Sequence, residues 1–286
     1  MPELPEVETI RRQLEPLIVG KTISSIDVFN QNSFKVEKKS LIGGKVVDVG
    51  RKGKVLIISL KRPGPAEQGQ ALINTGLFVH LKMSGQLKFL EGLKRSNLAE
   101  ARLDLNTDKH LRVKIKFSDK SELWFIDQRK FGWITDDSSV LPKGIDAMDP
   151  KLTADKLEEV LQSSNRPVKT ILLDQSKIAG IGNIYASEIL WEAKISPFRK
   201  GQALLQQQGL ALIKSIRKIL TEAIKSGGST MGDGLYQQVG GESGDYWLRR
   251  RVYDREGELC LRCKTPVKKG VIGQRSTYWC PNCQAV

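Results

Sequence analysis

The stretch that decides the C-terminal fold reads CLRCKTPVKKGVIGQRSTYWCPNC, residues 260–283. It contains all four cysteines of the 286-residue chain, arranged as two Cys-x-x-Cys pairs that are sixteen residues apart. This spacing is typical of a structural zinc site, in which each pair forms a tight turn and four thiolates complete a tetrahedron around one Zn²⁺ ion. The expected ligands are Cys260, Cys263, Cys280 and Cys283.

Paired cysteines have two other common roles. Two disulfides would use all four thiols, but a reducing compartment and adjacent Cys-x-x-Cys pairs argue against them. A zinc deaminase acting on nucleobases would need a nearby His-x-Glu motif, and neither His80 nor His110 is followed by one. Because four protein ligands leave no open coordination position for water, we expect the zinc to hold structure and to take no part in chemistry.

The zinc-binding tail is strongly basic. Residues 249–286 hold nine lysines or arginines against three acidic residues, and the whole chain has 46 basic and 32 acidic residues, a net charge of +14. Two strand-like runs divided by a polar turn around residues 268–270 predict a β-hairpin finger with Arg275 near its tip. The charge favours a polyanionic partner, with nucleic acid the leading candidate. A solvated basic tail stapled by zinc is the simpler alternative.

The rest of the chain has an ordinary globular composition, with 40% hydrophobic and 27% charged residues. No apolar run approaches the roughly 18 residues that a membrane-spanning helix needs. The N-terminus, MPELPEVE, lacks the basic start and the apolar core of a secretory signal. We therefore expect a cytoplasmic protein with no membrane partner, and a length sufficient for about two domains.

The hydrophobic pattern divides the chain into two halves. Spacings of three and four over residues 5–19 predict an amphipathic helix, and the runs that follow predict strands separated by turns. After Asp149-Pro150 the period becomes helical. The expected fold is α+β: an N-terminal helix-capped β-sandwich domain (1–145), a helical domain (146–248) and a zinc finger (249–286). The strands are expected at 23–28, 45–49, 55–60, 72–81, 111–117 and 123–126, and the later helices at 152–161, 168–173, 184–191 and 204–224.

Two glycine-containing segments lie in the helical half. The segment IAGIGN, residues 178–183, joins two predicted helices, and backbone amides in such a turn can bind phosphate. Any two packed helices can also be joined by glycines, so this motif alone is not decisive. Residues 226–246 hold seven glycines without a period and predict a flexible loop. Loops of this length are uncommon unless they act as lids or binding loops, or are disordered.

The start of the chain is a candidate nucleophile. Removal of Met1 would leave Pro2 as a secondary α-amine beside Glu3. An α-amine with a pKa near 8 is roughly 10% neutral at pH 7, whereas only about one lysine in two thousand is. Attack on an aldehydic sugar carbon would give an iminium that acts as an electron sink for eliminating phosphate. The simpler interpretation is that the prolines shape the start of a helix and the nearby acids complement its dipole.

These motifs coincide, in order along the chain, with those of one known family. PELPEVE (2–8), HLKMSG (80–85), DQRKFG (127–132), GIGNIYASE (180–188) and the four-cysteine finger with GQRST (273–277) resemble formamidopyrimidine-DNA glycosylase, also called MutM. The resemblance implies a bifunctional enzyme of DNA base-excision repair. Such an enzyme removes oxidised purines, such as 8-oxoguanine and formamidopyrimidines, and then cleaves the strand by β,δ-elimination. The implied partner is double-stranded DNA with oxidised bases or abasic sites, bound by a monomer.

The resemblance also implies catalytic roles for individual residues. Pro2 would attack C1′ of the damaged nucleotide, and Glu3 would be the acid/base that assists sugar opening and proton transfer. Glu6 would be a second active-site carboxylate. Lys54 would hold a phosphate next to the lesion, and Arg275 of the finger would hold a neighbouring one. This chemistry requires that Met1 be removed, because a retained methionine would block the amine.

A second set of residues would bind the DNA around the lesion. An everted base leaves a hole in the stack, which calls for a flexible apolar side chain, an aromatic wedge and a donor for the orphaned cytosine. Met83, Phe131 and Arg129 match these three roles. The loop 226–246 corresponds to the family's segment that closes over the everted base. The complete set expected to bind DNA is His80, Met83, Arg129, Phe131, Lys169 and Asn183.

Three positions depart from the family pattern. Lys82 stands where the family usually has glycine, Gln128 where it has proline and Lys130 where it has arginine. Two alternative functions stay open on the sequence alone: an oxidised-pyrimidine glycosylase of the endonuclease VIII type, and a non-catalytic zinc-finger protein that binds DNA. The opening PELPE, in place of the PEGPE of the endonuclease VIII group, favours oxidised purines.

Overall fold

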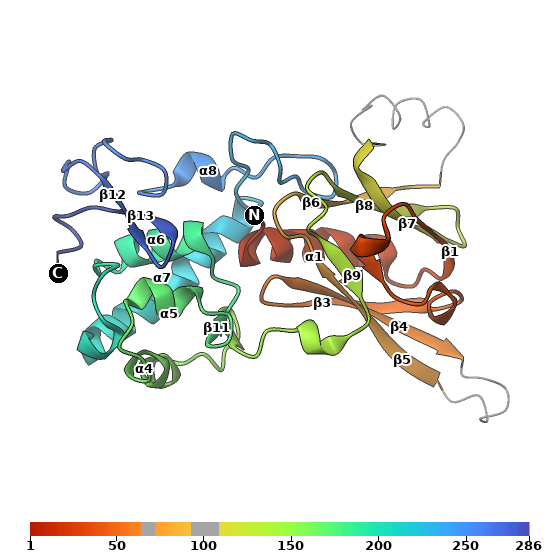
Figure 1. Cartoon of the computed structure of the whole chain (residues 1–286), viewed down its shortest axis with the longest axis horizontal. Helices are drawn as coiled ribbons and strands as arrows, with labels where there is room; N and C mark the ends of the chain where they lie inside the picture. The colour runs from red at the N-terminus through yellow and green to blue at the C-terminus, as the bar shows by residue number, and fades with distance from the viewer. Residues whose placement is uncertain (64–71, 93–108, 286) are drawn as a thin grey trace. The chain divides into compact units, whose positions relative to one another are not determined.

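The computed structural model describes residues 1–63, 72–92 and 109–285, which fold into two compact units. Unit 1 comprises residues 1–2, 6–141 and 227–244, and unit 2 comprises residues 3–5, 142–226 and 245–286. The elements of both units are labelled in Figure 1. Each unit is assembled from segments that are distant in the sequence. The boundaries at 145 and 248 inferred from the hydrophobic pattern stay predictions.

Unit 1 is built around helix α1 (Leu4–Ile18). The spacing of three and four puts Val7, Ile10, Leu14 and Ile18 on one buried face. The helix ends before Gly20, whose φ of +87° is a left-handed conformation that glycine adopts without steric cost. The predicted amphipathic helix is therefore present, shifted by one residue at each end.

Two sheets enclose this helix. The four-stranded sheet has the order β1-β7-β8-β6, and the five-stranded sheet has the order β2-β9-β5-β4-β3. Neighbouring strands are antiparallel except for β2 and β9, which are parallel. The strands of the first sheet are β1 (Ile23–Val28), β6 (Gly85–Leu90), β7 (Leu111–Phe117) and β8 (Glu122–Asp127). Those of the second are β2 (Phe34–Lys35), β3 (Lys45–Lys52), β4 (Val55–Pro63), β5 (Leu72–His80) and β9 (Trp133–Thr135).

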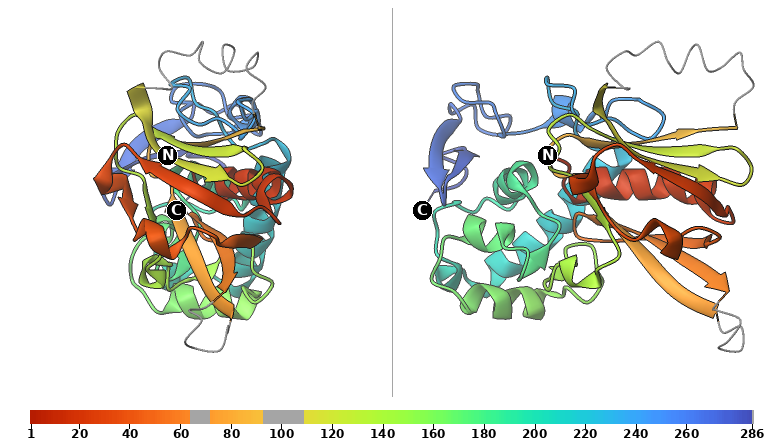
Figure 2. Two further views of the ribbon diagram at one scale, coloured as in Figure 1. Left: turned by 90° about the vertical axis from the view of Figure 1, so that its right-hand side faces the viewer. Right: turned by 45° about the vertical axis from the view of Figure 1, so that its right-hand side comes forward.

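Both sheets and the helix share one hydrophobic core. Ile10 and Leu14 of α1 pack in the same cluster as Val113 and Phe125 of the first sheet and Ile58 of the second. Figure 2 shows helix α1, in red, running alongside both sheets. The predicted helix-capped β-sandwich is confirmed. Strands β2, β6 and β9 were not predicted from the sequence.

Unit 2 is mainly helical. A two-stranded parallel pair, β10 (Ile145–Asp146) and β11 (Ile178–Ala179), precedes the turn that leads into α6. None of the helices in the described part of the chain is both long and apolar enough to cross a membrane. The helices are α4 (Ala154–Gln162), α5 (Val168–Leu173), α6 (Asn183–Glu192), α7 (Gln206–Lys225) and α8 (Tyr246–Arg249). Short 3₁₀ helices lie at Gln31–Ser33, Lys38–Ser40 and Ser138–Val140 in unit 1 and at Gly201–Ala203 in unit 2.

The finger is an antiparallel hairpin of β12 (Lys268–Ile272) and β13 (Arg275–Trp279). The prediction of its turn at residues 268–270 is wrong, because these residues pair with 277–279 inside the ladder. The turn is Gly273-Gln274, where both residues have positive φ, +53° and +62°, as a tight hairpin turn requires. Lys268, Lys269 and Gly270 have the composition of a turn, but in the structure they form part of strand β12, with both lysines exposed. Arg275 is the first residue after the turn, so its predicted place near the tip is confirmed.

The glycine-rich segment has no strand or helix over residues 227–244, as predicted, but it packs against unit 1. Tyr236 and Val239 are buried in the sandwich core. The Gln13 side chain of α1 donates to Gln238 Oε1 (2.6 Å) and accepts from the Val239 N–H (3.1 Å). The segment is therefore an ordered loop in this structure, anchored to helix α1.

Candidate active site and DNA-binding surfaces

The carboxylate of Glu3 lies at the N-terminus of α6. Its oxygens accept hydrogen bonds from the backbone N–H groups of Gly182 (2.7 Å), Ile184 (3.0 Å) and Tyr185 (3.4 Å). The first N–H groups of a helix have no partner within the helix, and the helix dipole favours a negative charge there. The sequence suggested that amides of this turn could bind phosphate. In the structure, Glu3 accepts from one amide of this turn, that of Gly182, and from two in the first turn of α6.

Gly182 is necessary for this arrangement. A Cβ atom added at Gly182 would lie 2.2 Å from Cδ of Glu3, well inside van der Waals contact. Gly180 is restricted too, since it has a φ of +108° and an added Cβ would lie 2.4 Å from a methyl of Leu4. The Leu4 N–H donates to the Gly180 carbonyl (3.1 Å). The glycines of the GIGN motif thus allow the start of the chain to approach the helix closely.

Lys169 and Asn183 both contact the finger strand β13. Lys169 is fully buried, and its Nζ donates to the Ser276 carbonyl (2.8 Å) and to Thr277 Oγ1 (2.9 Å). The Asn183 side-chain amide donates to the same Ser276 carbonyl (3.0 Å). Burial lowers the pKa of Lys169 to about 7; Glu3 opposes this shift and Arg275 adds to it. The structure therefore places Lys169 and Asn183 directly behind the strand that begins with the exposed Arg275.

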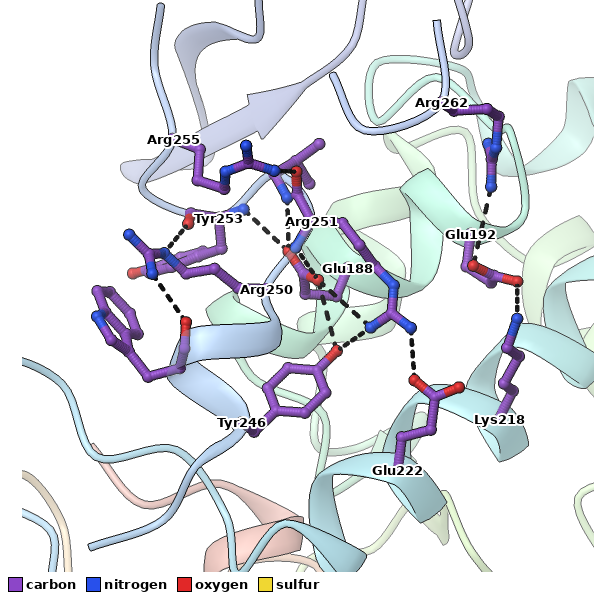
Figure 3. Close-up of polar contacts among 12 residues, drawn as sticks. Glu188, Glu192, Lys218, Glu222, Tyr246, Arg250, Arg251, Tyr253, Arg255 and Arg262 are labelled. Carbon is purple, nitrogen blue, oxygen red and sulfur yellow. Dashed lines mark hydrogen bonds and ion pairs between the residues drawn. The ribbon is translucent and has the colours of Figure 1, made fainter. Parts of the chain in front are cut away.

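Helix α6 also holds the segment that leads into the finger (Figure 3). The buried Glu188 carboxylate accepts from the backbone N–H groups of Arg251 (2.8 Å), Val252 (2.9 Å) and Tyr253 (2.9 Å). The Arg251 guanidinium pairs with Glu222 of α7 and donates to the Tyr246 hydroxyl. Sequence reasoning missed this network, although Glu188 closes the GIGNIYASE motif that it singled out. One helix thus positions both Glu3 and the approach to the finger.

The four cysteine sulfurs lie within 4.8 Å of one another. Sγ of Cys263 is 3.3 Å from that of Cys280, and Sγ of Cys260 is 4.0 Å from that of Cys283. Four ligands at about 2.3 Å around a tetrahedral zinc ion are about 3.8 Å apart, which these separations fit. A disulfide needs sulfurs about 2.05 Å apart, so the geometry is not that of two disulfides. The four predicted ligands come together as a closed, structural zinc site.

In unit 1, Lys54 lies next to His80. Strands β3 and β4 pair up to Lys52 and Val55, and Val55 pairs in turn with His80 of β5. The His80 ring packs against Trp133 in a tilted arrangement with ring centroids 5.5 Å apart, and its Nδ1 accepts from the Lys82 N–H (2.9 Å). Burial lowers the pKa of His80 to about 3, and the charges of Lys82 and Lys54 add to the shift. His80 is therefore a neutral imidazole at physiological pH.

Pro2 and Glu6 are both buried in unit 1. The Glu6 carboxylate accepts from the Ser229 N–H (2.8 Å), and an added Cβ at Gly228 would lie 3.0 Å from it. Burial raises the pKa of the Tyr236 hydroxyl, and the negative charge of Glu6 raises it further. Glu6 thus links helix α1 to the start of the loop 227–244.

Met83, Arg129 and Phe131 lie on two loops that one carboxylate ties together. Asp127 is fully buried and accepts from Ser84 Oγ (2.5 Å) and from the Gly132 N–H (2.7 Å). Phe131 is 56% exposed, and the Arg129 guanidinium lies 5.2 Å from its ring centroid. Phe131 is therefore not a core side chain, and its role as a wedge stays a prediction. Asp127 was not selected from the sequence as a functional residue.

Two departures from the family pattern lie on these loops in the left-handed region. Lys82 has a φ of +53° and Lys130 a φ of +59°. At position 82 the chain thus keeps a backbone conformation that favours glycine, although it carries a lysine there. The substitution leaves the loop able to present the Lys82 N–H to His80.

The comparisons with known proteins agree along the whole chain. Three family descriptions match in succession: the formamidopyrimidine-DNA glycosylase N-terminal domain (1–134), its H2TH domain (143–234) and the zinc finger found in FPG and IleRS (257–286). A formamidopyrimidine-DNA glycosylase of Prochlorococcus marinus (strain MIT 9301) is 36% identical over 307 residues, which cover 99% of this chain and 100% of the relative.

Solved structures give the same result. A structure of MutM in complex with DNA containing carbocyclic 8-oxo-G matches with a TM-score of 0.81 and 33% identity, covering 100% of both chains. A complex of Lactococcus lactis Fpg with DNA containing an abasic site has a TM-score of 0.81 and 32% identity, covering 99% of this chain and 100% of that one. The protein is thus a DNA-repair glycosylase with a zinc finger. The chain belongs to the formamidopyrimidine-DNA glycosylase family. The predictions of family, α+β fold and one structural zinc ion are confirmed.

Proposed function

We propose that this enzyme removes oxidised purines from double-stranded DNA and then cleaves the strand, with Pro2 as the nucleophile. The observation that carries the proposal is Glu3, the next residue, whose buried carboxylate is held by three amides at the N-terminus of α6. A carboxylate fixed in this way is oriented for proton transfer. The DNA in the solved structures of relatives, with 8-oxo-G or an abasic site, supports this choice of substrate.

The chemistry proceeds through an imine. The neutral Pro2 nitrogen forms a bond to C1′ of the damaged nucleotide, and the bond from C1′ to the base breaks, so that the base departs with a proton. Glu3 supplies and removes the protons that open the sugar ring and give an iminium. Loss of a C2′ proton expels the 3′ phosphate, a second elimination expels the 5′ phosphate, and water releases Pro2. A bound zinc ion would hold the finger in shape.

The remaining predicted residues serve binding. We propose that Lys54, His80, Asn183 and Arg275 bind phosphates around the lesion, and that Lys169 supports β13 behind Arg275. His80 would do so as a neutral donor, since its Nδ1 is already an acceptor. Met83, Phe131 and Arg129 would fill the space left by the everted base, and Glu6 would support the loop that covers that base.

Borohydride trapping tests the nucleophile. Wild-type protein with Met1 removed should become covalently joined to 8-oxoguanine DNA on reduction, with the adduct located on Pro2 by mass spectrometry. Pro2→Gly and Glu3→Gln should lose most of this product while still binding DNA. Glu37→Gln removes one exposed acidic charge and serves as the matched control. Trapping of Pro2→Gly and Glu3→Gln at the control rate would refute the assignment.

Trapping, together with rates of base excision, separates the alternative functions. A non-catalytic DNA-binding protein would bind lesion DNA without forming a covalent product. An oxidised-pyrimidine glycosylase would excise thymine glycol faster than 8-oxoguanine opposite cytosine, and the two rates decide. We also propose that the enzyme acts as a monomer in the cytoplasm, which light scattering of the free protein and cell fractionation would test.

A further inference from the structure

The turn that presents Lys54 is held from behind by Arg51, an arginine whose side chain is largely shielded from solvent. Strands β3 and β4 pair up to Lys52 and Val55, so Gly53 and Lys54 form a two-residue hairpin turn. Gly53 has a φ of +58°, which such a turn requires at its first position. The Lys54 residue is only 8% exposed. The direction of its side chain therefore depends on the exact conformation of this turn.

Arg51 connects the turn to helix α1. Its Nη1 donates to the Gly53 carbonyl (3.3 Å), and its Nε donates to Oε2 of Glu8 (2.9 Å). The Arg51 side chain is 9% exposed. Because the guanidinium is planar and rigid, fixing its Nε also fixes the direction in which Nη1 points. Glu8 thus determines where Arg51 holds the turn.

Glu8 is itself fixed by two further arginines. Its carboxylate accepts from both Nε and Nη2 of Arg11 (3.2 Å each) and from Nε of Arg12 (2.7 Å). Burial by itself would raise the pKa of Glu8, but the hydrogen bonds from Arg11, Arg12 and Arg51 lower it to about 2. The carboxylate is therefore ionised at neutral pH. The side chain of Arg12 is 58% exposed, and it contacts Oε1 of Glu8, whereas Arg51 contacts Oε2.

We propose that Arg51, held by Glu8, is the positioning residue for Lys54. Neither Arg51 nor Glu8 has a role in the predicted chemistry. The Arg51 side chain is 9% exposed and already donates to Glu8 and Gly53, so it does not reach a phosphate itself. Its role is to hold the Gly53-Lys54 turn so that the Lys54 ammonium meets the phosphate beside the lesion. This inference rests on the proposed function, because it assumes that Lys54 binds DNA.

Glu8→Ala separates positioning from long-range electrostatics by the sign of its effect. Removing this carboxylate makes the protein more positive by one charge, which by itself would strengthen binding to a polyanion. A loss of Lys54 positioning predicts the opposite, weaker binding and slower trapping. A merely structural role would lower the unfolding temperature without changing the salt dependence of binding.

A double-mutant cycle tests the proposal. Wild type, Arg51→Met, Lys54→Met and the double variant are compared for single-turnover borohydride trapping on 8-oxoguanine DNA. Arg51→Met should slow trapping by about tenfold or more, since a misplacement of about 1 Å can cost up to about a hundredfold. In a protein that already carries Lys54→Met, the Arg51→Met change should slow trapping no further. The slope of log K against log salt should fall by about 0.9 in each variant, the value for one lost phosphate contact.

Arg12→Met is the matched control, because Arg11 still donates to both oxygens of Glu8 and no contact of Arg51 is removed. It should keep the wild-type rate within about twofold, and its salt slope should differ from the wild-type slope by much less than the value of about 0.9 for one lost phosphate contact. Circular dichroism reports whether each variant folds. If Arg51→Met does not fold, Arg51→Lys replaces it, since an ammonium lacks the planar pair of donors that joins Glu8 to Gly53.

The positioning role would be overturned if the trapping rate of the double variant fell by the product of the two single effects. It would also be overturned if Arg51→Met behaved like Arg12→Met. Absence of trapping in the wild type would refute the proposed function instead, so the two failures are distinct.

Discussion

The buried side chain of Lys169 loses its proton at a lower pH than an exposed lysine does, because burial lowers its pKa. Its pKa of about 7 means that the native state releases a proton that the unfolded chain keeps up to about pH 10.4. The unfolded state therefore binds more protons between these values, and stability rises with pH across this window. The cost of burying the ammonium is present in full below about pH 7 and disappears above the pKa of the unfolded chain.

We expect wild type to gain stability relative to Lys169→Met between pH 7.5 and 9.5, by up to about 1.4 kcal/mol per pH unit. Urea unfolding followed at three pH values measures the difference. Parallel stability curves for the two proteins would contradict the lowered pKa.

His80 gives a second test at single-residue scale, because the chain has only two histidines. The Lys82 N–H donates to Nδ1, so the proton of the neutral ring sits on Nε2. Long-range ¹H–¹⁵N NMR should show one histidine that stays neutral in the Nε2–H form from pH 7.5 down to 5.5. The other signal, from His110, is assigned with His80→Gln. Protonation of His80 near pH 6.5 would show this environment to be wrong.

Individual residues differ in how visible they are to sequence reasoning. The four cysteines were identified from spacing alone, because a metal site demands a fixed set of ligands. Pro2 and Glu3 were ambiguous until the family motifs were considered. Glu188 and Asp127 were missed, since a buried carboxylate that accepts backbone N–H groups has no signature in the sequence around it.

At the scale of elements, the start of α6 depends on one glycine. Gly182→Ala would place a methyl group 2.2 Å from the Glu3 carboxylate carbon, so Glu3 must move away from its three amides. The φ of Gly182, −124°, permits alanine, so the lack of space beside Glu3 is what opposes the substitution. We expect a loss of about tenfold or more in borohydride trapping, because the acid/base group is displaced.

Gly209→Ala in helix α7 is the matched control, since an added Cβ there meets nothing within 4 Å. It should raise the free energy of unfolding by about 0.5–1 kcal/mol and leave trapping unchanged. Equal trapping by both alanine variants would show that the contact between Glu3 and the helix is dispensable.

Elements with a strong period were the predictable ones. The strands 23–28 and 111–117 and the helix 168–173 match the structure at both ends. Strand β9 has three residues and α8 has four, too few to show a period, and tertiary contacts form them. The finger turn was misplaced because polar residues occur both in turns and on exposed strands. Only the positive φ of Gly273 and Gln274 distinguishes the two.

At the scale of the whole molecule, the zinc site should be separable from the sandwich. Cys260→Ser removes one thiolate from the closed site, so the variant should lose zinc and bind DNA at least about tenfold more weakly. Circular dichroism should retain most of the strand signal, because the sandwich core contains none of the finger. Metal content and fluorescence anisotropy measure the two losses. Stoichiometric zinc with normal affinity would contradict the assignment.

The indole of Trp191 has a consequence for how the metal can be monitored. Its Nε1 donates to Sγ of Cys260 (3.4 Å), and the Arg262 guanidinium lies 4.0 Å from its ring centroid. A fluorophore in contact with a zinc ligand reports directly on that ligand. Chelation should therefore alter the intrinsic emission of the protein, and Trp191→Phe should reduce that response, leaving the part that comes from Trp279 beside Cys280. The intrinsic tryptophan fluorescence of the protein should therefore report whether the zinc site is occupied.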